Sequence, residues 1–243
     1  MTPTRYILGS RSPRRRELLA RLVPVTSIEV VPPARAEEPG FDGLSDWPSI
    51  RAHLQEIARH KAEQVRQQIG RETAAATIIT ADTTIVCGSG ANLPGDSLDP
   101  AGVLQPPLLV LGQPPERDDW TDVVRGWFHT HYAGRTHMAA TAVCVVSREG
   151  TVSERVVTTA VTIRHDVDRW LEWYLGTGEP RGKAGGYALQ GAGSVFVTQV
   201  TGSLSNVVGL PLEALAEMLG ISSPPHAIPF QSPVNTSVAG PVM

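Results

Sequence analysis

The chain has 243 residues, of which 41% are apolar and 19% are charged, and its net charge is −3. These values are ordinary for a soluble globular protein, and the length allows a sizeable core. The small negative charge excludes general nucleic-acid binding, which needs a broad basic excess, so any phosphate site must be local. The chain has no secretory apolar region and no apolar run long enough to span a membrane, which predicts a cytoplasmic protein without a membrane partner.

The first predicted elements are a short buried strand at 6–8 and a helix that follows it. Ser12 and Pro13 are the preferred residues for the N-cap and the first position of a helix. The first turn then carries arginines at 14–16, where acidic residues would suit the helix dipole. An anion bound beside the exposed N–H groups would relieve this repulsion. The segment is therefore either a solvated basic turn or one side of a phosphate site.

Hydrophobic periodicity and turn residues predict the remaining elements. Helices are expected at 49–69, at 120–132, from an Asp166 cap to 175, and at 211–219. Strands are expected at 28–31, 77–86, 138–146, 152–163 and 195–197, with 138–146 and 152–163 forming a hairpin. Strands that intermix with helices favour a mixed α/β sheet. We expect one domain over 1–222, with an irregular insertion at 88–109 and a disordered tail at 223–243.

The cysteines and histidines give no metal signal. Cys87 and Cys144 each lie in an apolar run, which predicts buried free thiols and argues against a disulfide or a zinc site. His129 and His131 are two residues apart, so they do not share a helix face, and no metal site is predicted there or at His137.

A lone carboxylate in an apolar strand is the sharpest single feature. Asp82 interrupts the predicted strand 77–86, and a buried charge is usually paired, metal-bound or catalytic. It is therefore either a structural partner of a buried cation or helix end, or part of a site. Glu37 and Glu38 alone predict surface residues, but together with Asp82 they would suit Mg²⁺, which prefers a few carboxylates plus phosphate oxygens.

Two further segments carry charge or glycine toward a possible ligand. Lys61 lies near the apolar face of the predicted helix, where it either points at a phosphate or extends outward; its spacing favours the outward direction. The glycine-rich segment 183–187 would bring backbone close to a ligand, with Lys183 supplying charge and Gln190 hydrogen bonds. It fits neither a Walker A loop nor a dinucleotide fingerprint. The segment 202–211 fits a structural turn equally well.

In their order and spacing these motifs resemble the Maf family (septum-formation-protein-like) of nucleoside triphosphate pyrophosphatases, over about residues 5–220. The matching segments are 10–15 with 17–19, 61–62, 81–83, 134–137, 177–180, 183–187 with 190–191, and 206–211. The resemblance implies a mixed α/β fold with two lobes around a nucleotide cleft, similar to inosine triphosphate pyrophosphatases, and often a homodimer.

The resemblance also implies an activity and a set of residues. The reaction would be hydrolysis between the α and β phosphates with Mg²⁺ or Mn²⁺, giving a nucleoside monophosphate and pyrophosphate. Asp82, Arg15 and Lys61 would be catalytic, and Glu38 and Asp82 would hold the metal. Substrate would contact Ser10, Arg14, Arg15, Lys61, Gln113, Lys183 and Gln190. The Ala-Asp-Thr form of 81–83 is similar to the branch that acts on dTTP and UTP.

The chain departs from the family pattern at two positions. Gln113 stands where the family has a lysine on the triphosphate, and Gly182 stands where it usually has an aspartate. Losing one cationic contact in a partly desolvated site costs on the order of 2–4 kcal/mol of transition-state stabilisation. The predicted insertion contains no Lys or Arg to replace it. This leaves open a weak or inactive nucleotide-binding regulatory protein, and also a hydrolase for another phosphoanhydride or phosphoester.

Overall fold

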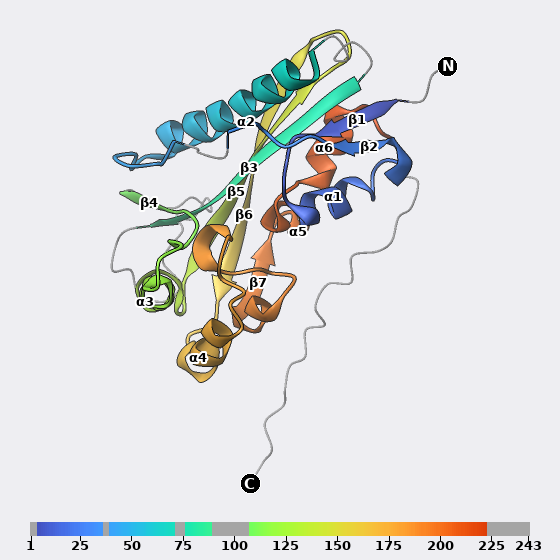
Figure 1. The fold of residues 1–243 in the computed structure, drawn as a ribbon. Helices are drawn as coiled ribbons and strands as arrows, with labels where there is room; N and C mark the ends of the chain where they lie inside the picture. Colours follow the sequence, from blue (N-terminus) through green and yellow to red (C-terminus); the bar gives the residue numbers. More distant parts are fainter. Residues whose placement is uncertain (1–3, 36–38, 71–75, 89–106, 223–243) are drawn as a thin grey trace.

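The computed structural model describes residues 4–35, 39–70, 76–88 and 107–222, which build a mixed sheet covered by helices (Figure 1). The strand order is β2-β1-β3-β5-β6-β7, with β4 beside β3. The strands are β1 (Arg5–Leu8), β2 (Ile28–Val30), β3 (Ala76–Gly88), β4 (Leu108–Leu111), β5 (Thr136–Val146), β6 (Val152–Ile163) and β7 (Val197–Thr201). The predicted mixed α/β fold is confirmed, and so is the β5–β6 hairpin.

Six α-helices are found in the described part of the chain. They are α1 (Pro13–Leu19), α2 (Trp47–Ile69), α3 (Trp120–Trp127), α4 (Asp168–Gly176), α5 (Leu204–Val208) and α6 (Leu212–Met218). The predicted helix 120–132 is continuous, but its last turn, Phe128–Tyr132, is π-helical. Within the described ranges, no helix combines the length and the apolarity needed to cross a bilayer.

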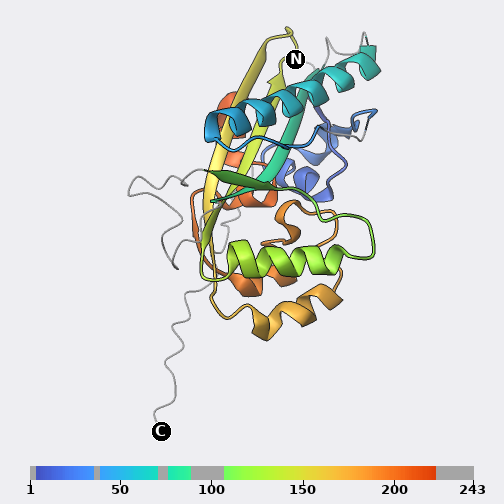
Figure 2. The same cartoon turned by 90° about the vertical axis from the view of Figure 1, so that its left-hand side faces the viewer.

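The helices cover the two faces of the sheet unequally. Ile78 and Ile79 are neighbours on β3 and point to opposite faces. Ile78 packs in a core cluster with α2, whereas Ile79 packs in one with α1 and α6. A third cluster joins α3 and α4 to the far end of the long strands. Figure 2, turned by 90°, shows α3 and α4 stacked away from α2. Helices α1, α2 and α6 thus form one group, and α3 and α4 form the other, at the far end of the strands. These two helix groups form the two predicted lobes.

The buried faces match the sequence pattern closely. Leu18, Leu19 and Leu22 of the first helical segment are buried, as predicted. The apolar positions of α2 are also buried: Ile50, Leu54, Ile57, Ala58, Ala62 and Val65. Cys87 and Cys144 are buried free thiols, which confirms that prediction.

The predicted irregular insertion is wrong at both ends, since Gly88 still belongs to β3. Leu108 and Leu109 belong to β4, which pairs antiparallel with the end of β3, Ile85 lying opposite Leu111. All four residues of this strand are apolar, so it shows no alternation, and it follows a Gly- and Pro-rich segment that was interpreted as a loop. The tail 223–243 and most of the insertion lie outside the described residues.

Two other local predictions are wrong, and one helix was missed. Asp166 does not cap α4, because Val167 occupies the N-cap position and the Asp166 carboxylate binds Arg164 instead, at 2.6 Å. The strand expected at 195–197 begins at Val197, after a 3₁₀ segment Ala192–Phe196. Helix α5 was not predicted, because five residues between glycines read as a turn.

The glycine-rich segment after α4 folds back against β3 and β4. Gly185 has a φ of 72°, its N–H donates to the carbonyl of Gly112 at 2.8 Å, and its own carbonyl accepts from the hydroxyl of Tyr132 at 2.8 Å. A Cβ at Gly185 would lie 2.5 Å from both the Ile85 Cγ1 and the Tyr132 oxygen. Only glycine therefore allows this turn to lie against the sheet.

We predict that Gly185→Ala lowers the free energy of unfolding by about 3 kcal/mol or more, since it adds overpacking to a left-handed backbone. The matched control is Gly178→Ala, where φ is 69° and the added Cβ meets nothing within 4 Å. The control should lose only about 1–2 kcal/mol, the left-handed strain alone. Urea denaturation measures both, and equal losses would contradict the packing explanation.

Candidate functional site

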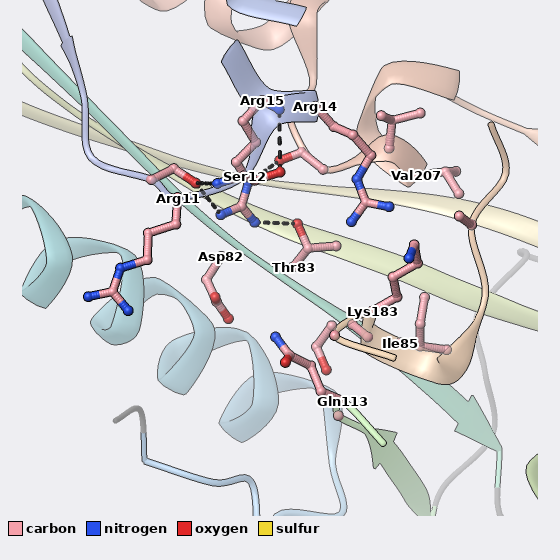
Figure 3. A pocket seen from close by; sticks show the side chains of 18 of the residues that line it. Arg11, Ser12, Arg14, Arg15, Asp82, Thr83, Ile85, Gln113, Lys183 and Val207 are labelled. Atoms are coloured by element: carbon pink, nitrogen blue, oxygen red, sulfur yellow. Dashed lines mark hydrogen bonds between the residues drawn. The ribbon is translucent and has the colours of Figure 1, made fainter. Parts of the chain in front are cut away.

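A cleft of about 910 Å³ opens beside β3, between the two helix groups (Figure 3). On the edge of β3 away from β5, β1 pairs with residues 76–79 and β4 with residues 85–88. In the described part of the chain, no strand pairs with 80–84 on that edge. The cleft occupies this opening and is lined there by Asp82, Thr83 and Thr84.

The cleft brings together every predicted site residue that the structure describes. They come from five segments that lie far apart in the sequence, and all of them line the same cavity: Ser10, Arg14, Arg15, Lys61, Asp82, Gln113, Lys183 and Gln190. Glu37 and Glu38 lie outside the described residues. The structure thus supports one shared site, while the chemical role of each residue stays a prediction.

The arginine-rich turn begins as the sequence indicated. Ser12 is the N-cap of α1, its hydroxyl accepting from the Arg15 N–H at 3.5 Å, with Pro13 at the start of the helix. Ser10 is buried, and its hydroxyl accepts from the Ser12 N–H at 3.2 Å. These hydrogen bonds fix the backbone of the turn at the start of α1. The Arg14 and Arg15 side chains extend from this turn to line the cleft.

Arg15 joins three walls of the cleft. Its Nε donates to the Gly209 carbonyl at the end of α5, at 2.8 Å, and one terminal nitrogen donates to the Thr83 hydroxyl of β3, at 3.0 Å. The other terminal nitrogen lies 3.4 Å from the Ser10 hydroxyl. Arg15 thus binds protein oxygens on both neighbouring elements. Arg15 therefore helps to hold α1, β3 and the end of α5 together. No local sequence signal could have shown these contacts.

Lys61 and Asp82 form a buried ion pair between α2 and β3. The Lys61 Nζ lies 2.6 Å from Asp82 Oδ1, and both side chains are 11% exposed. The nearby Thr80 hydroxyl donates to the Ala58 carbonyl of α2 at 2.6 Å. The outward direction that spacing favoured for Lys61 is therefore wrong, because a carboxylate on the facing strand compensates its charge.

Arg14 and Lys183 approach each other from opposite sides of the cleft (Figure 3). Burial lowers the pKa of the Lys183 ammonium, and the Arg14 guanidinium lowers it further. The Lys183 Nζ also donates to the Glu179 carbonyl. Two cations directed at each other are unfavourable unless an anion lies between them, so this pair indicates an anion site.

The cleft as a whole is strongly basic. Of the lining side chains that the structure describes, six are cationic and two are acidic: Arg11, Arg14, Arg15, Arg35, Lys61 and Lys183 against Asp82 and Glu116. The whole chain, in contrast, has a net charge of −3. Sequence reasoning missed Arg11 and Arg35, although the first stands inside the arginine-rich turn. Such a concentration of positive charge suits a polyphosphate.

A neutral, buried histidine supports the wall that carries Lys183. His137 lies 2.8 Å through Nε2 from the Tyr187 hydroxyl, and Tyr187 lines the cleft. Complete burial lowers the pKa of His137 to about 3, so its ring is uncharged near neutral pH. Its place in the segment 134–137 is thus explained by packing.

The residues present fit a divalent cation held partly by substrate. Within the described ranges, no group of three or more His, Cys, Asp or Glu side chains is placed to hold a metal. Mg²⁺ in phosphate-processing sites needs only one or two carboxylates, because phosphate oxygens and water complete its shell. Asp82, at the cleft wall, meets that requirement.

Comparison with known proteins finds similar sequences over nearly the whole chain. The family model described as Maf-like protein matches residues 5–221. The dTTP/UTP pyrophosphatase of Anaeromyxobacter dehalogenans is 36% identical over 232 residues, 94% of this chain and 98% of the relative. That of Thermococcus kodakarensis is 32% identical, covering 86% of this chain and 92% of the relative. A Mycobacterium abscessus structure, described as a nucleoside-triphosphatase / dITP/XTP pyrophosphatase, is 16% identical over 67% of this chain and 75% of that chain. Its TM-score of 0.38 adds no support.

We predict that Arg14→Gln raises the pKa of Lys183, because it removes the like charge that faces the ammonium. A ¹³C-lysine NMR titration of the ligand-free protein measures this directly. Arg16→Gln is the control, since Arg16 is exposed on the same helix and is not among the lining residues. An unchanged Lys183 titration in Arg14→Gln would show that the two cations do not interact.

Proposed function

Since this chain belongs to the family of Maf-like proteins, we propose that it hydrolyses nucleoside triphosphates, with dTTP and UTP as substrates. The products are the nucleoside monophosphate and pyrophosphate. The observation that carries the proposal is the convergence of Arg14 and Lys183 in a basic cleft, beside the buried Lys61–Asp82 pair. The names of the related enzymes and the Ala-Asp-Thr sequence at 81–83 support the choice of base.

The cationic side chains have the task of neutralising the triphosphate. Phosphoryl transfer needs positioning and charge stabilisation more than covalent chemistry, and preorganised cations supply both. Arg14 and Lys183 bind oxygens of the chain of phosphates from two sides. Arg11 and Arg35, at the same cleft, add positive charge that offsets part of the loss at Gln113.

Asp82 has the role of general base. Its carboxylate accepts a proton from a water molecule whose oxygen attacks the α phosphorus, and the bond to the bridging oxygen breaks to release pyrophosphate. The Lys61 ammonium, 2.6 Å away, fixes the orientation of the carboxylate and balances its charge. Arg15 keeps β3 and α1 at a constant separation while the leaving group departs.

In the alternative role, Asp82 would hold a divalent cation, Mg²⁺ or Mn²⁺, together with Glu38, and would not then accept the proton itself. When bound, the cation supplies further charge neutralisation on the phosphate oxygens. A homodimer and a cytoplasmic location also stay predictions.

A second candidate, a nucleotide-binding protein with little or no turnover, is favoured by Gln113. This neutral amide lines the cleft at the position where the family pattern has a lysine. We predict that Gln113→Lys raises kcat/KM by about 30- to 1,000-fold if the missing cation limits the rate. Equal activity in the two proteins would show that other cations have replaced it.

The proposed function is tested with a panel of nucleoside triphosphates, scored separately for pyrophosphate and orthophosphate, with Mg²⁺, Mn²⁺ or EDTA. We expect pyrophosphate from dTTP and UTP, loss of activity in EDTA, and a kcat about 10²- to 10⁴-fold lower in Asp82→Asn, since a general base contributes that much. Nucleotide binding by Asp82→Asn, measured by calorimetry, is the control for folding. Wild-type protein that releases no pyrophosphate from any nucleotide would refute the proposal, and orthophosphate alone would indicate another hydrolase class.

A further inference from the structure

Glu179 makes an unusual contact across the segment that carries Lys183 and Gln190. It follows α4, and its carboxylate turns back into the protein. Oε2 accepts from the Ala192 N–H at 2.8 Å, and Oε1 accepts from the Gly193 N–H at 2.9 Å. Both oxygens therefore bind the start of the 3₁₀ segment, as charge-assisted hydrogen bonds, which are stronger than neutral ones.

The surrounding glycines indicate that this contact is built into the fold. A Cβ at Gly191 would lie 1.9 Å from Glu179 Oε2. The φ of Gly191 is −122°, so the position needs glycine for space and not for backbone conformation. A Cβ at Gly193 would lie 3.0 Å from backbone atoms of Ala188. Larger residues at 191 would displace the carboxylate from its two N–H partners.

The segment between the two ends of this contact faces the cleft. Lys183 and Gln190 both line the cavity, whereas Glu179 does not. The Glu179 backbone carbonyl accepts from the Lys183 Nζ, while its carboxylate binds the residues just after Gln190. A single residue thus holds one substrate-facing side chain directly and the other through the adjoining backbone.

We propose that Glu179 is a positioning residue that holds Lys183 and Gln190 in place for the triphosphate, without touching the substrate itself. The inference rests on the proposed function, because it takes the cleft to be the nucleotide site. Arg14 repels Lys183, so an untethered lysine would turn toward solvent. The Glu179 carbonyl opposes this only while its backbone is held in place. The two carboxylate bonds hold it from the side chain, and the Glu179 N–H donates to the Thr177 hydroxyl at 3.1 Å.

The first test measures the contact without any activity. Hydrogen exchange at the Ala192 and Gly193 amides is compared in wild type, Glu179→Gln and Glu179→Ala, with Glu56→Gln as a control on the exposed side of α2. We expect exchange about tenfold faster or more in both Glu179 variants, consistent with loss of charge-assisted hydrogen bonds. The control should match wild type. Unchanged exchange in Glu179→Gln would overturn the proposal even if the enzyme proves inactive.

The second test asks whether Glu179 acts through the two side chains. With dTTP we expect Glu179→Gln to lower kcat/KM about 10- to 100-fold, since a small misplacement of a binding group costs up to about 10². In the Lys183→Ala/Gln190→Ala background, the same substitution should cost less than about threefold, because coupled residues are not additive. The affinity for a non-hydrolysable α,β-methylene analogue gives the same comparison if turnover is too slow to measure.

The outcomes separate the two proposals. A full loss from Glu179→Gln in the double-variant background would overturn the positioning role, since the residue would then act elsewhere. Wild-type protein that releases no pyrophosphate from any nucleotide would refute the proposed function, while the exchange data would still decide on the contact. Gly191→Ala is a second variant, used in case the Glu179 variants misfold. Its added methyl group displaces the Glu179 carboxylate, so it should reproduce both the faster amide exchange and the lower kcat/KM.

Discussion

The opening along one edge of β3 is the constraint on which the rest of the structure depends. β5 pairs with the other edge from Ile78 to Val86, so the strand cannot bend away. β1 pairs with β3 only up to Ile79, and β4 pairs with it only from Ile85 onward, which leaves the middle of β3 without a strand neighbour on that side among the described residues. A sheet edge must be paired or covered. Here the covering is made by charged side chains and loops, and the space between them is the cleft.

Two kinds of charged residue meet at this opening. Lys61, Asp82, Arg15 and Glu179 bind other protein groups and hold α2, β3, α1 and the segment after α4 in fixed relation. Arg14 and Lys183 face each other, and within the described residues neither forms an ion pair with a carboxylate. The first kind offsets the cost of burying charge by pairing. The second leaves positive charge unbalanced, which is the arrangement that a polyphosphate stabilises.

Replacement of one cation need not remove the function of such a cleft. Its electrostatic potential is the sum of several charges, and six cationic side chains line it. A single neutral amide at Gln113 therefore changes the local contact more than the overall field. Residues such as Arg11 and Arg35 contribute to the same field from the α1 and α2 sides of the cleft.

The sequence by itself determined the periodic and capped elements, because those signals are local. The Ser12–Pro13 helix start, the buried face of α2 and the β5–β6 hairpin were all readable from spacing. It also picked out five of the charged residues that line the cleft, Arg14, Arg15, Lys61, Asp82 and Lys183, but not Arg11 or Arg35. The direction of Lys61, the strand β4 and the bonds of Arg15 to Thr83 and Gly209 were decided only by the tertiary structure. Each depends on a partner far along the chain, and a side chain's environment is set by such partners and not by its neighbours in sequence.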